Sequence, residues 1–109
     1  MRGWIVFGVV ALFVGSANAA DFPRYDPEGY CKAYATDDGL YSSESYNYCI
    51  GDEQQAYDAV KESWGEYPDQ VTDYCLDYVG YDADASYESL QYCLKDEMQA
   101  LAGKKAFKF

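Results

Sequence analysis

Four cysteines and two pairs of neighbouring carboxylates are the groups in this 109-residue chain whose types and spacing could support chemistry. The sequence contains no histidine, so neither a Ser-His-Asp nor a Cys-His arrangement for nucleophilic catalysis can be assembled. Zinc, copper and iron sites lose their usual imidazole ligand by the same absence. The cysteines form no CxxC pair, and their even number favours two disulfides over thiolate chemistry. We therefore expect no enzyme, no metal centre and no cofactor.

The carboxylate pairs are Asp52-Glu53 and Asp96-Glu97, each of which follows a cysteine by one helical turn. Glu53 and Glu97 fall on the predicted inward face of a helix, where a carboxylate is costly unless it is hydrogen-bonded. Two buried acids could act as acid and base, as in a glycosidase. We favour a structural role, in which each acid accepts hydrogen bonds from a tyrosine hydroxyl or from the N-terminus of a partner helix.

Two acidic loops, residues 36–41 and 81–85, offer the oxygen ligands that calcium prefers. The weak candidate ligands are Asp37, Asp38, Asp82 and Asp84. An EF-hand is excluded, because the sixth position counted from Asp82 is Tyr87 rather than glycine and the twelfth is Cys93 rather than glutamate. The expectation is solvated turn acids, and a small-ligand or calcium-binding carrier remains the alternative function.

An internal duplication organises the elements that carry these groups. A shift of 44 positions superimposes Tyr30-Cys31 on Tyr74-Cys75 and Tyr48-Cys49 on Tyr92-Cys93. The segments 49–56 and 93–100 then share Cys, Asp, Glu, Gln and Ala at the same places, with an Ile/Leu exchange. Such a period indicates two copies of one structural unit.

Each copy is predicted to be a helical hairpin, spanning residues 25–65 and 69–109. Helical spacing places one residue set per copy on the inner face of the first helix: Pro27, Tyr30, Cys31, Tyr34 and Ala35, and Val71, Tyr74, Cys75, Tyr78 and Val79. Asp26-Pro27-Glu28 is a helix start, and Gly80 a helix stop.

The second, longer helix of each copy has a similar face. It consists of Tyr46, Cys49, Ile50, Glu53, Tyr57, Val60 and Trp64 in the first copy, and of Leu90, Cys93, Leu94, Glu97 and Leu101 in the second. Four cysteines allow three pairings, and the antiparallel geometry favours Cys31–Cys49 and Cys75–Cys93. The predicted fold class is all-α, with two disulfide-stapled hairpins packed as a four-helix arrangement.

These motifs resemble a group of small exported bacterial proteins, mostly alphaproteobacterial, whose function is uncharacterised. The pattern is Tyr-Cys on a first helix and then Ser-Tyr-x5-Cys-x3-Glu-x2-Ala. The second copy fits it at Ser86-Tyr87, Cys93, Glu97 and Ala100, whereas the first copy has Ser42-Ser43 in place of Ser-Tyr. The resemblance implies a similar fold and an exported location, and it brings no activity.

The first residues are typical of a secretory signal peptide, cleaved after Ala19 or Ala20. Arg2 supplies the positive charge, residues 4–14 an apolar run that is too short to span a bilayer, and Ala17-Asn18-Ala19 the cleavage site. The rest, residues 20–109, is expected to be one small domain without a transmembrane anchor, in the periplasm or secreted. Removing Arg2 from eight basic and 19 acidic residues leaves a net charge of −12. Nucleic-acid binding is therefore disfavoured.

Thirteen tyrosines are the most unusual feature of the composition. Those beside the cysteines are expected to cover the disulfides, whereas Tyr25, Tyr41, Tyr67 and Tyr81 lie in or near turns and are expected to be exposed. Lys104, Lys105 and Lys108 form the one basic cluster, interpreted as compensation of a helix dipole. Exposed tyrosines among acids indicate a non-enzymatic interaction module that binds a protein or envelope component, with a cationic partner as one version. The alternative is that tyrosine simply replaces aliphatic residues in a small stapled core.

Overall fold

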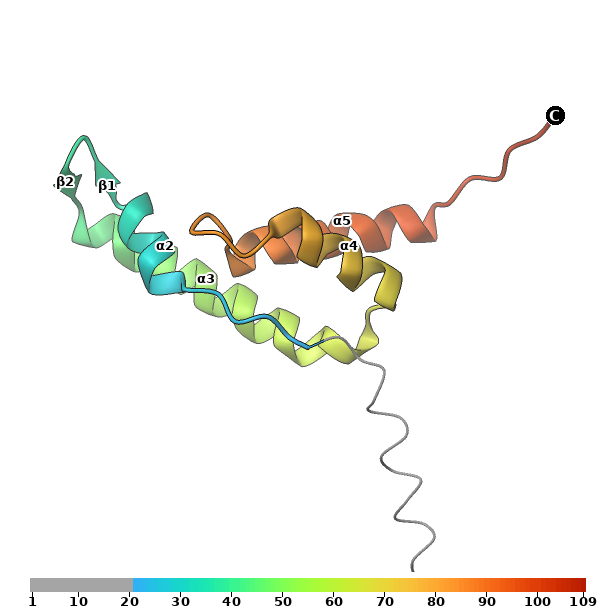
Figure 1. Cartoon of the computed structure of the whole chain (residues 1–109), viewed down its shortest axis with the longest axis horizontal. Helices are drawn as coiled ribbons and strands as arrows, with labels where there is room; N and C mark the ends of the chain where they lie inside the picture. The colour runs from blue at the N-terminus through green and yellow to red at the C-terminus, as the bar shows by residue number, and fades with distance from the viewer. Residues whose placement is uncertain (1–20) are drawn as a thin grey trace, which may run out of the picture.

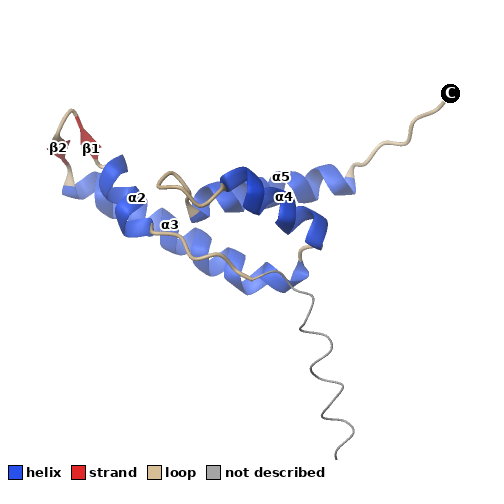
Figure 2. Cartoon of the chain, viewed as in Figure 1, coloured by secondary structure: helices blue, strands red, loops and turns tan. Residues whose placement is uncertain are grey.

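The computed structural model describes residues 21–109, and the expected signal segment 1–19 lies outside this part of the chain. The described part contains four α-helices, α2 (Pro27–Tyr34), α3 (Ser43–Ser63), α4 (Asp69–Val79) and α5 (Tyr87–Ala102). A 3-10 turn, η1 (Trp64–Glu66), follows α3, and two short strands, β1 (Thr36–Asp37) and β2 (Leu40–Tyr41), lie between α2 and α3. The predicted all-α class is confirmed, with this small β-ribbon as an addition (Figures 1 and 2).

Side chains before three of the helices satisfy backbone N–H groups that have no partner inside the helix. Asp26 accepts a hydrogen bond from Gly29 N at 3.0 Å, and Pro27 opens α2 where the missing N–H costs nothing. Ser42 and Ser86 cap α3 and α5 through bonds from Ser45 N and Ser89 N, both at 3.1 Å. The helix start predicted at Asp26 is therefore confirmed.

Gly39 and Gly80 have positive φ values, one in the turn of the β-ribbon and the other at the end of α4. Asp38 and Gly39 both have positive φ, 51° and 80°, which is the geometry of a two-residue hairpin turn between β1 and β2. Gly80 ends α4 with φ of 73°, as its position in the sequence predicted.

Two disulfides join the helices within each hairpin and use all four cysteines of the chain. Cys31–Cys49 links α2 to α3, and Cys75–Cys93 links α4 to α5, each across 18 residues of sequence. The predicted pairing is confirmed. In the chain-entropy model, a closed loop of this size stabilises the folded state by about 3 kcal/mol.

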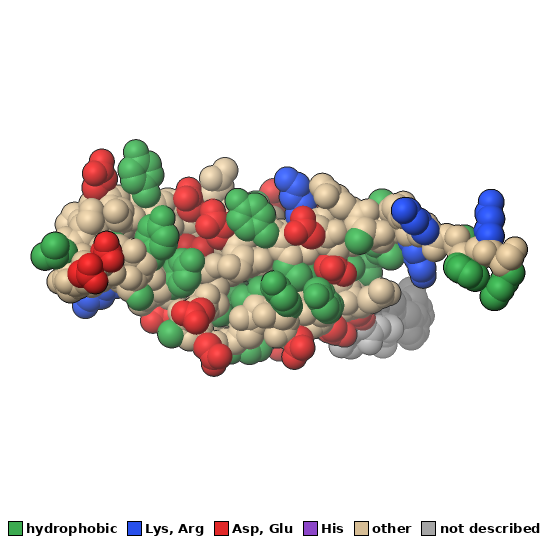
Figure 3. Space-filling model, turned by 90° about the horizontal axis from the view of Figure 1, so that it is seen from above, with side chains coloured by type: hydrophobic (Ala, Val, Ile, Leu, Met, Phe, Trp, Pro, Cys, Tyr) green, Lys and Arg blue, Asp and Glu red, His purple; other side chains and the backbone are tan. Residues whose placement is uncertain are grey.

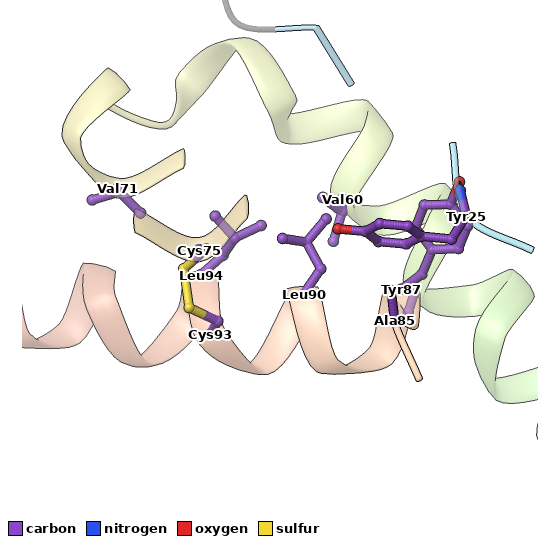
Figure 4. Close-up of a cluster of buried hydrophobic side chains, with 10 residues drawn as sticks. Tyr25, Val60, Val71, Cys75, Ala85, Tyr87, Leu90, Cys93 and Leu94 are labelled. Carbon is purple, nitrogen blue, oxygen red and sulfur yellow. Dashed lines mark hydrogen bonds between the residues drawn. A yellow bond between two sulfur atoms is a disulfide. The ribbon is translucent and has the colours of Figure 1, made fainter. Parts of the chain in front are cut away.

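The two hairpins pack against each other through α3 and α5. The buried cluster at this contact contains Val60 and Ala56 of α3 together with Leu90 and Leu94 of α5, and the Cys75–Cys93 bond lies beside Leu94 (Figure 4). Leu90 and Leu94 have no exposed surface, so α5 is held between α3 on one side and α4 on the other. The predicted four-helix arrangement thus has α5 as its central element. No helix among residues 21–109 is long and apolar enough to cross a membrane.

The hairpins share a design but differ in their details. α3 has 21 residues and α5 has 16, and only the first hairpin has strands in its connecting loop. The second hairpin ends at Ala102, short of the predicted boundary at 109, and an exposed segment follows it. The duplication itself stays a prediction from the sequence.

The inner face of the first helices is rotated relative to the prediction. Val71, Thr72 and Cys75 are buried on α4, while Tyr74 and Tyr78 are exposed. Among the tyrosines that precede a cysteine, Tyr48, Tyr74 and Tyr92 are all exposed. The reason is geometric: consecutive residues of an α-helix are about 100° apart, so a tyrosine next to an inward cysteine turns toward solvent.

Candidate functional site

Glu53 of α3 is the buried carboxylate that connects the two hairpins. Its side chain is 2% exposed, and its oxygens accept hydrogen bonds from the backbone N–H of Tyr87 at 2.8 Å and of Glu88 at 3.0 Å. These are the first two residues of α5, where N–H groups lack partners and the helix dipole favours negative charge. Of the two predicted partners, a helix N-terminus is the one that Glu53 contacts.

Glu97 does not repeat this arrangement. Its side chain is only half-buried on α5, so the prediction that it occupies an inward position like that of Glu53 is wrong. Glu97 lies ten residues beyond the backbone that Glu53 contacts, which is about 15 Å along the helix axis. A pair of glycosidase carboxylates requires about 5–9.5 Å, so the structure gives no support to joint acid–base chemistry by these residues.

A network around Tyr87 fastens the segment before α2 to the hairpins. The Tyr87 hydroxyl accepts a hydrogen bond from Tyr25 N at 2.8 Å and donates one to Pro23 O at 2.9 Å. Phe22 packs on the ring of Tyr87 with centroids 5.8 Å apart, and it also contacts Trp64 at 5.2 Å. This role of Tyr87 was not predicted from the sequence. Its position directly after Ser86, at the expected start of a helix, was the one available signal.

Tyr25 was expected to be exposed and available for interaction, and the structure corrects this. It is 9% exposed, with its ring 4.8 Å from that of Tyr87. Its hydroxyl is the one buried side-chain polar atom in the described part of the chain without a hydrogen-bond partner. Burial raises the pKa of Tyr25 to about 12, and the nearby hydroxyls of Tyr81 and Tyr87 act in the same direction.

The other three predicted interaction residues are spread over the molecule. Tyr41 is exposed on β2 and Tyr81 is exposed after α4, on different hairpins. Tyr67 is half-buried against Trp64, with ring centroids 6.2 Å apart, and burial followed by the charge of Glu66 raises its pKa. These residues therefore do not form one site.

The structure instead brings a different set of tyrosines together in a groove between α4 and α5, which we call the tyrosine groove. It measures about 370 Å³, and its walls are Tyr74 and Tyr78 of α4 and Ser89, Tyr92, Cys93, Asp96 and Glu97 of α5. The rings of Tyr74 and Tyr78 stack with centroids 5.9 Å apart, and both rings are exposed. Aromatic faces beside two carboxylates provide the contacts that a cationic group prefers.

The four candidate calcium ligands are exposed loop residues. Asp37 and Asp38 lie in the β-ribbon, whereas Asp82 and Asp84 lie between α4 and α5. In residues 21–109 no three His, Cys, Asp or Glu side chains are close enough together to hold a metal ion. The calcium carrier stays an untested alternative that no observation in the structure favours.

Comparison of the chain with protein-family models, curated proteins and solved structures found no match. The resemblance drawn from the Tyr-Cys and Ser-Tyr motifs therefore stays a prediction.

Replacing Glu53 by glutamine is expected to lower the free energy of unfolding by about 1–3 kcal/mol. A glutamine has one acceptor oxygen, so its NH2 group would face one of the two backbone donors. Chemical denaturation of the oxidised protein measures the effect. Glu97→Gln is the matched control, and it should change the free energy by no more than about 0.5 kcal/mol. Equal losses in both variants would contradict the role assigned to Glu53.

Tyr25→Phe and Tyr87→Phe are expected to have opposite effects. Removing the unpartnered Tyr25 hydroxyl should leave stability unchanged or raise it, whereas removing the Tyr87 hydroxyl breaks two hydrogen bonds and should cost about 1–3 kcal/mol.

The raised pKa of Tyr25 also predicts how stability depends on pH. The Tyr25 hydroxyl loses its proton near pH 10 in the unfolded chain and only near pH 12 in the folded protein, so the free energy of unfolding falls between these two values. Denaturation at several alkaline pH values should give a smaller fall in Tyr25→Phe than in wild type.

Proposed function

We propose that this protein is a non-enzymatic exported module that binds a basic protein partner through the tyrosine groove. The observation that carries the proposal is the convergence of three exposed tyrosines and two carboxylates on one groove between α4 and α5. Tyrosines are enriched at protein interfaces because a rigid ring offers a large contact area at low entropic cost.

The second disulfide supports this use of the groove. Cys93 lines the groove and is bonded to Cys75, so α4 and α5 are fixed relative to each other directly beneath the tyrosines. A binding surface on two cross-linked helices loses little conformational freedom when a partner binds. The stacked pair Tyr74–Tyr78 is thereby presented in one arrangement.

The charge of the protein favours a basic partner. Of the residues after position 20, seven are basic and 19 acidic, and the acids are distributed over the surface among the hydrophobic side chains, as the face in Figure 3 shows. A negative surface accelerates the approach of a cationic protein and repels acidic ones, and this effect weakens as salt is added. An arginine or lysine side chain is the group that fits the groove, because it can lie over the rings and meet Asp96 or Glu97.

Export is part of the proposal. The two disulfides are consistent with an oxidising compartment, since such bonds rarely persist in the cytosol. The apolar run and the Ala17-Asn18-Ala19 motif are the sequence features that support a cleaved signal peptide.

A short oligo-arginine peptide tests the groove. We expect it to bind the oxidised protein at low salt, and Tyr74→Ala/Tyr78→Ala to weaken binding by about tenfold through loss of both cation–π faces. Asp96→Asn/Glu97→Gln should weaken it similarly and flatten the salt dependence. Isothermal titration calorimetry gives the affinities. Tyr48→Ala, an equally exposed tyrosine on the other hairpin, is the control and should bind like wild type. Binding that is insensitive to the groove variants or to salt would refute the proposal.

Export predicts a definite molecular mass. The whole chain, expressed in a bacterium with a secretory pathway, should appear outside the cytosol as a protein that begins at Ala20 or Asp21 and carries two disulfides. Intact mass spectrometry before and after reduction and alkylation measures both features. Ala19→Arg/Ala20→Arg should block cleavage at either position, and a mass that retains residues 1–19 in the wild type would contradict the assignment of a signal peptide.

A further inference from the structure

The segment 103–109, which we call the tail, has a composition opposite to that of the helices it follows. It contains Lys104, Lys105 and Lys108, three of the seven basic residues found after position 20, and it contains no acid. It also contains Phe107 and Phe109, which are among the most exposed hydrophobic side chains in the described structure. The tail extends away from the helices (Figure 1), and Figure 3 shows its lysines and phenylalanines apart from the acidic surface.

Helix stabilisation accounts for only part of the tail. α5 ends at Ala102, and Lys104 follows closely, with its backbone N–H donating to Leu101 O at 3.4 Å. Dipole compensation stays a prediction for the lysines nearest the helix end, and it does not explain the two phenylalanines. Phe107 and Phe109 contact each other with ring centroids 4.9 Å apart, and both remain exposed to water. The two rings therefore leave apolar surface that no part of the described chain covers.

The tail and the tyrosine groove are complementary in charge and in chemistry. The groove offers the rings of Tyr74, Tyr78 and Tyr92 and two carboxylates. The tail offers ammonium groups for the carboxylates and for the faces of the rings, and phenyl rings that can stack on tyrosines. No other segment of the described chain has lysines and phenylalanines alternating in this way.

We propose that the tyrosine groove of one molecule binds the tail of a second copy of this chain. The inference rests on the proposed function, because it uses the same groove, and it names the basic tail of a second, otherwise acidic copy as the segment that the groove binds. Beyond Gly103 the tail projects away from the helices of its own molecule, to where a second copy can meet it (Figure 1). Two copies that exchange tails form a closed pair in which two weak contacts act together.

Sedimentation velocity over a range of protein concentrations tests the proposal with the oxidised full-length protein. We expect the wild type to form dimers at about 0.15 M salt, where ions screen the repulsion between two acidic chains beyond about 8 Å but leave the close contacts inside the groove, and to dissociate at about 1 M salt. The dissociation constant should rise by about tenfold or more in each of three variants. These are Lys104→Gln/Lys105→Gln/Lys108→Gln and Phe107→Ser/Phe109→Ser in the tail, and Tyr74→Ala/Tyr78→Ala in the groove. Lys32→Gln/Lys95→Gln removes two exposed lysines elsewhere and should leave the association unchanged. Circular dichroism verifies that each variant is folded.

A synthetic amidated peptide of residues 103–109 provides an independent measurement. It should bind the Lys104→Gln/Lys105→Gln/Lys108→Gln protein, whose groove is intact, and fail to bind once Tyr74→Ala/Tyr78→Ala is added. A wild type that stays monomeric at every concentration, or an association that the tail variants do not weaken, would overturn the proposal. So would a tail that binds phosphatidylglycerol vesicles but not the groove. If oligo-arginine binds the groove and the tail peptide does not, self-association is excluded while the proposed function stands.

Discussion

The bond between the Glu53 carboxylate and the first two N–H groups of α5 is the interaction on which the arrangement of the hairpins depends. A carboxylate that is almost fully buried is tolerated only where donors meet it, and the start of a helix supplies two donors and a favourable dipole. This requirement fixes where α5 begins relative to α3. Leu90 and Leu94 then fall against Val60 and Ala56, and Tyr87 is placed where the segment before α2 can close over it.

The sequence predicted those parts of the fold that depend on local patterns. Helical spacing located the four helices, and the position of each cysteine on its face gave both disulfides. Caps at Asp26 and Gly80 follow from the chemistry of single residues. The partner of Glu53 could be named only as a class, because the N–H groups that it meets lie 34 residues away and on the other hairpin. The sequence pattern could not distinguish Glu53 from Glu97, because the two glutamates occupy equivalent positions in the two copies. Only Glu53 faces the N-terminus of a helix.

The tyrosines show where reasoning from periodicity stops. A residue at the boundary of an apolar helix face fits the helical spacing whether it is buried or exposed. Tyr74 and Tyr78 are such residues, and the structure shows that both are exposed. Tyr25 shows the opposite error: it was predicted to be exposed, because residues near turns usually are. It is buried, because its ring packs against that of Tyr87. The groove depends on two adjacent helices each turning a tyrosine outward, which becomes visible only once their packing is known.

The position of α5 between α3 and α4 has a consequence for how the protein comes apart. Neither hairpin contains a complete core, since Leu90 and Leu94 are covered partly by their own hairpin and partly by the other. Local opening of one hairpin would expose apolar surface of both, so we expect the hairpins to unfold together as one cooperative unit. For a small disulfide-bonded protein, such cooperativity leaves few partly open states for a protease to cut, so its resistance to proteolysis would follow its global stability.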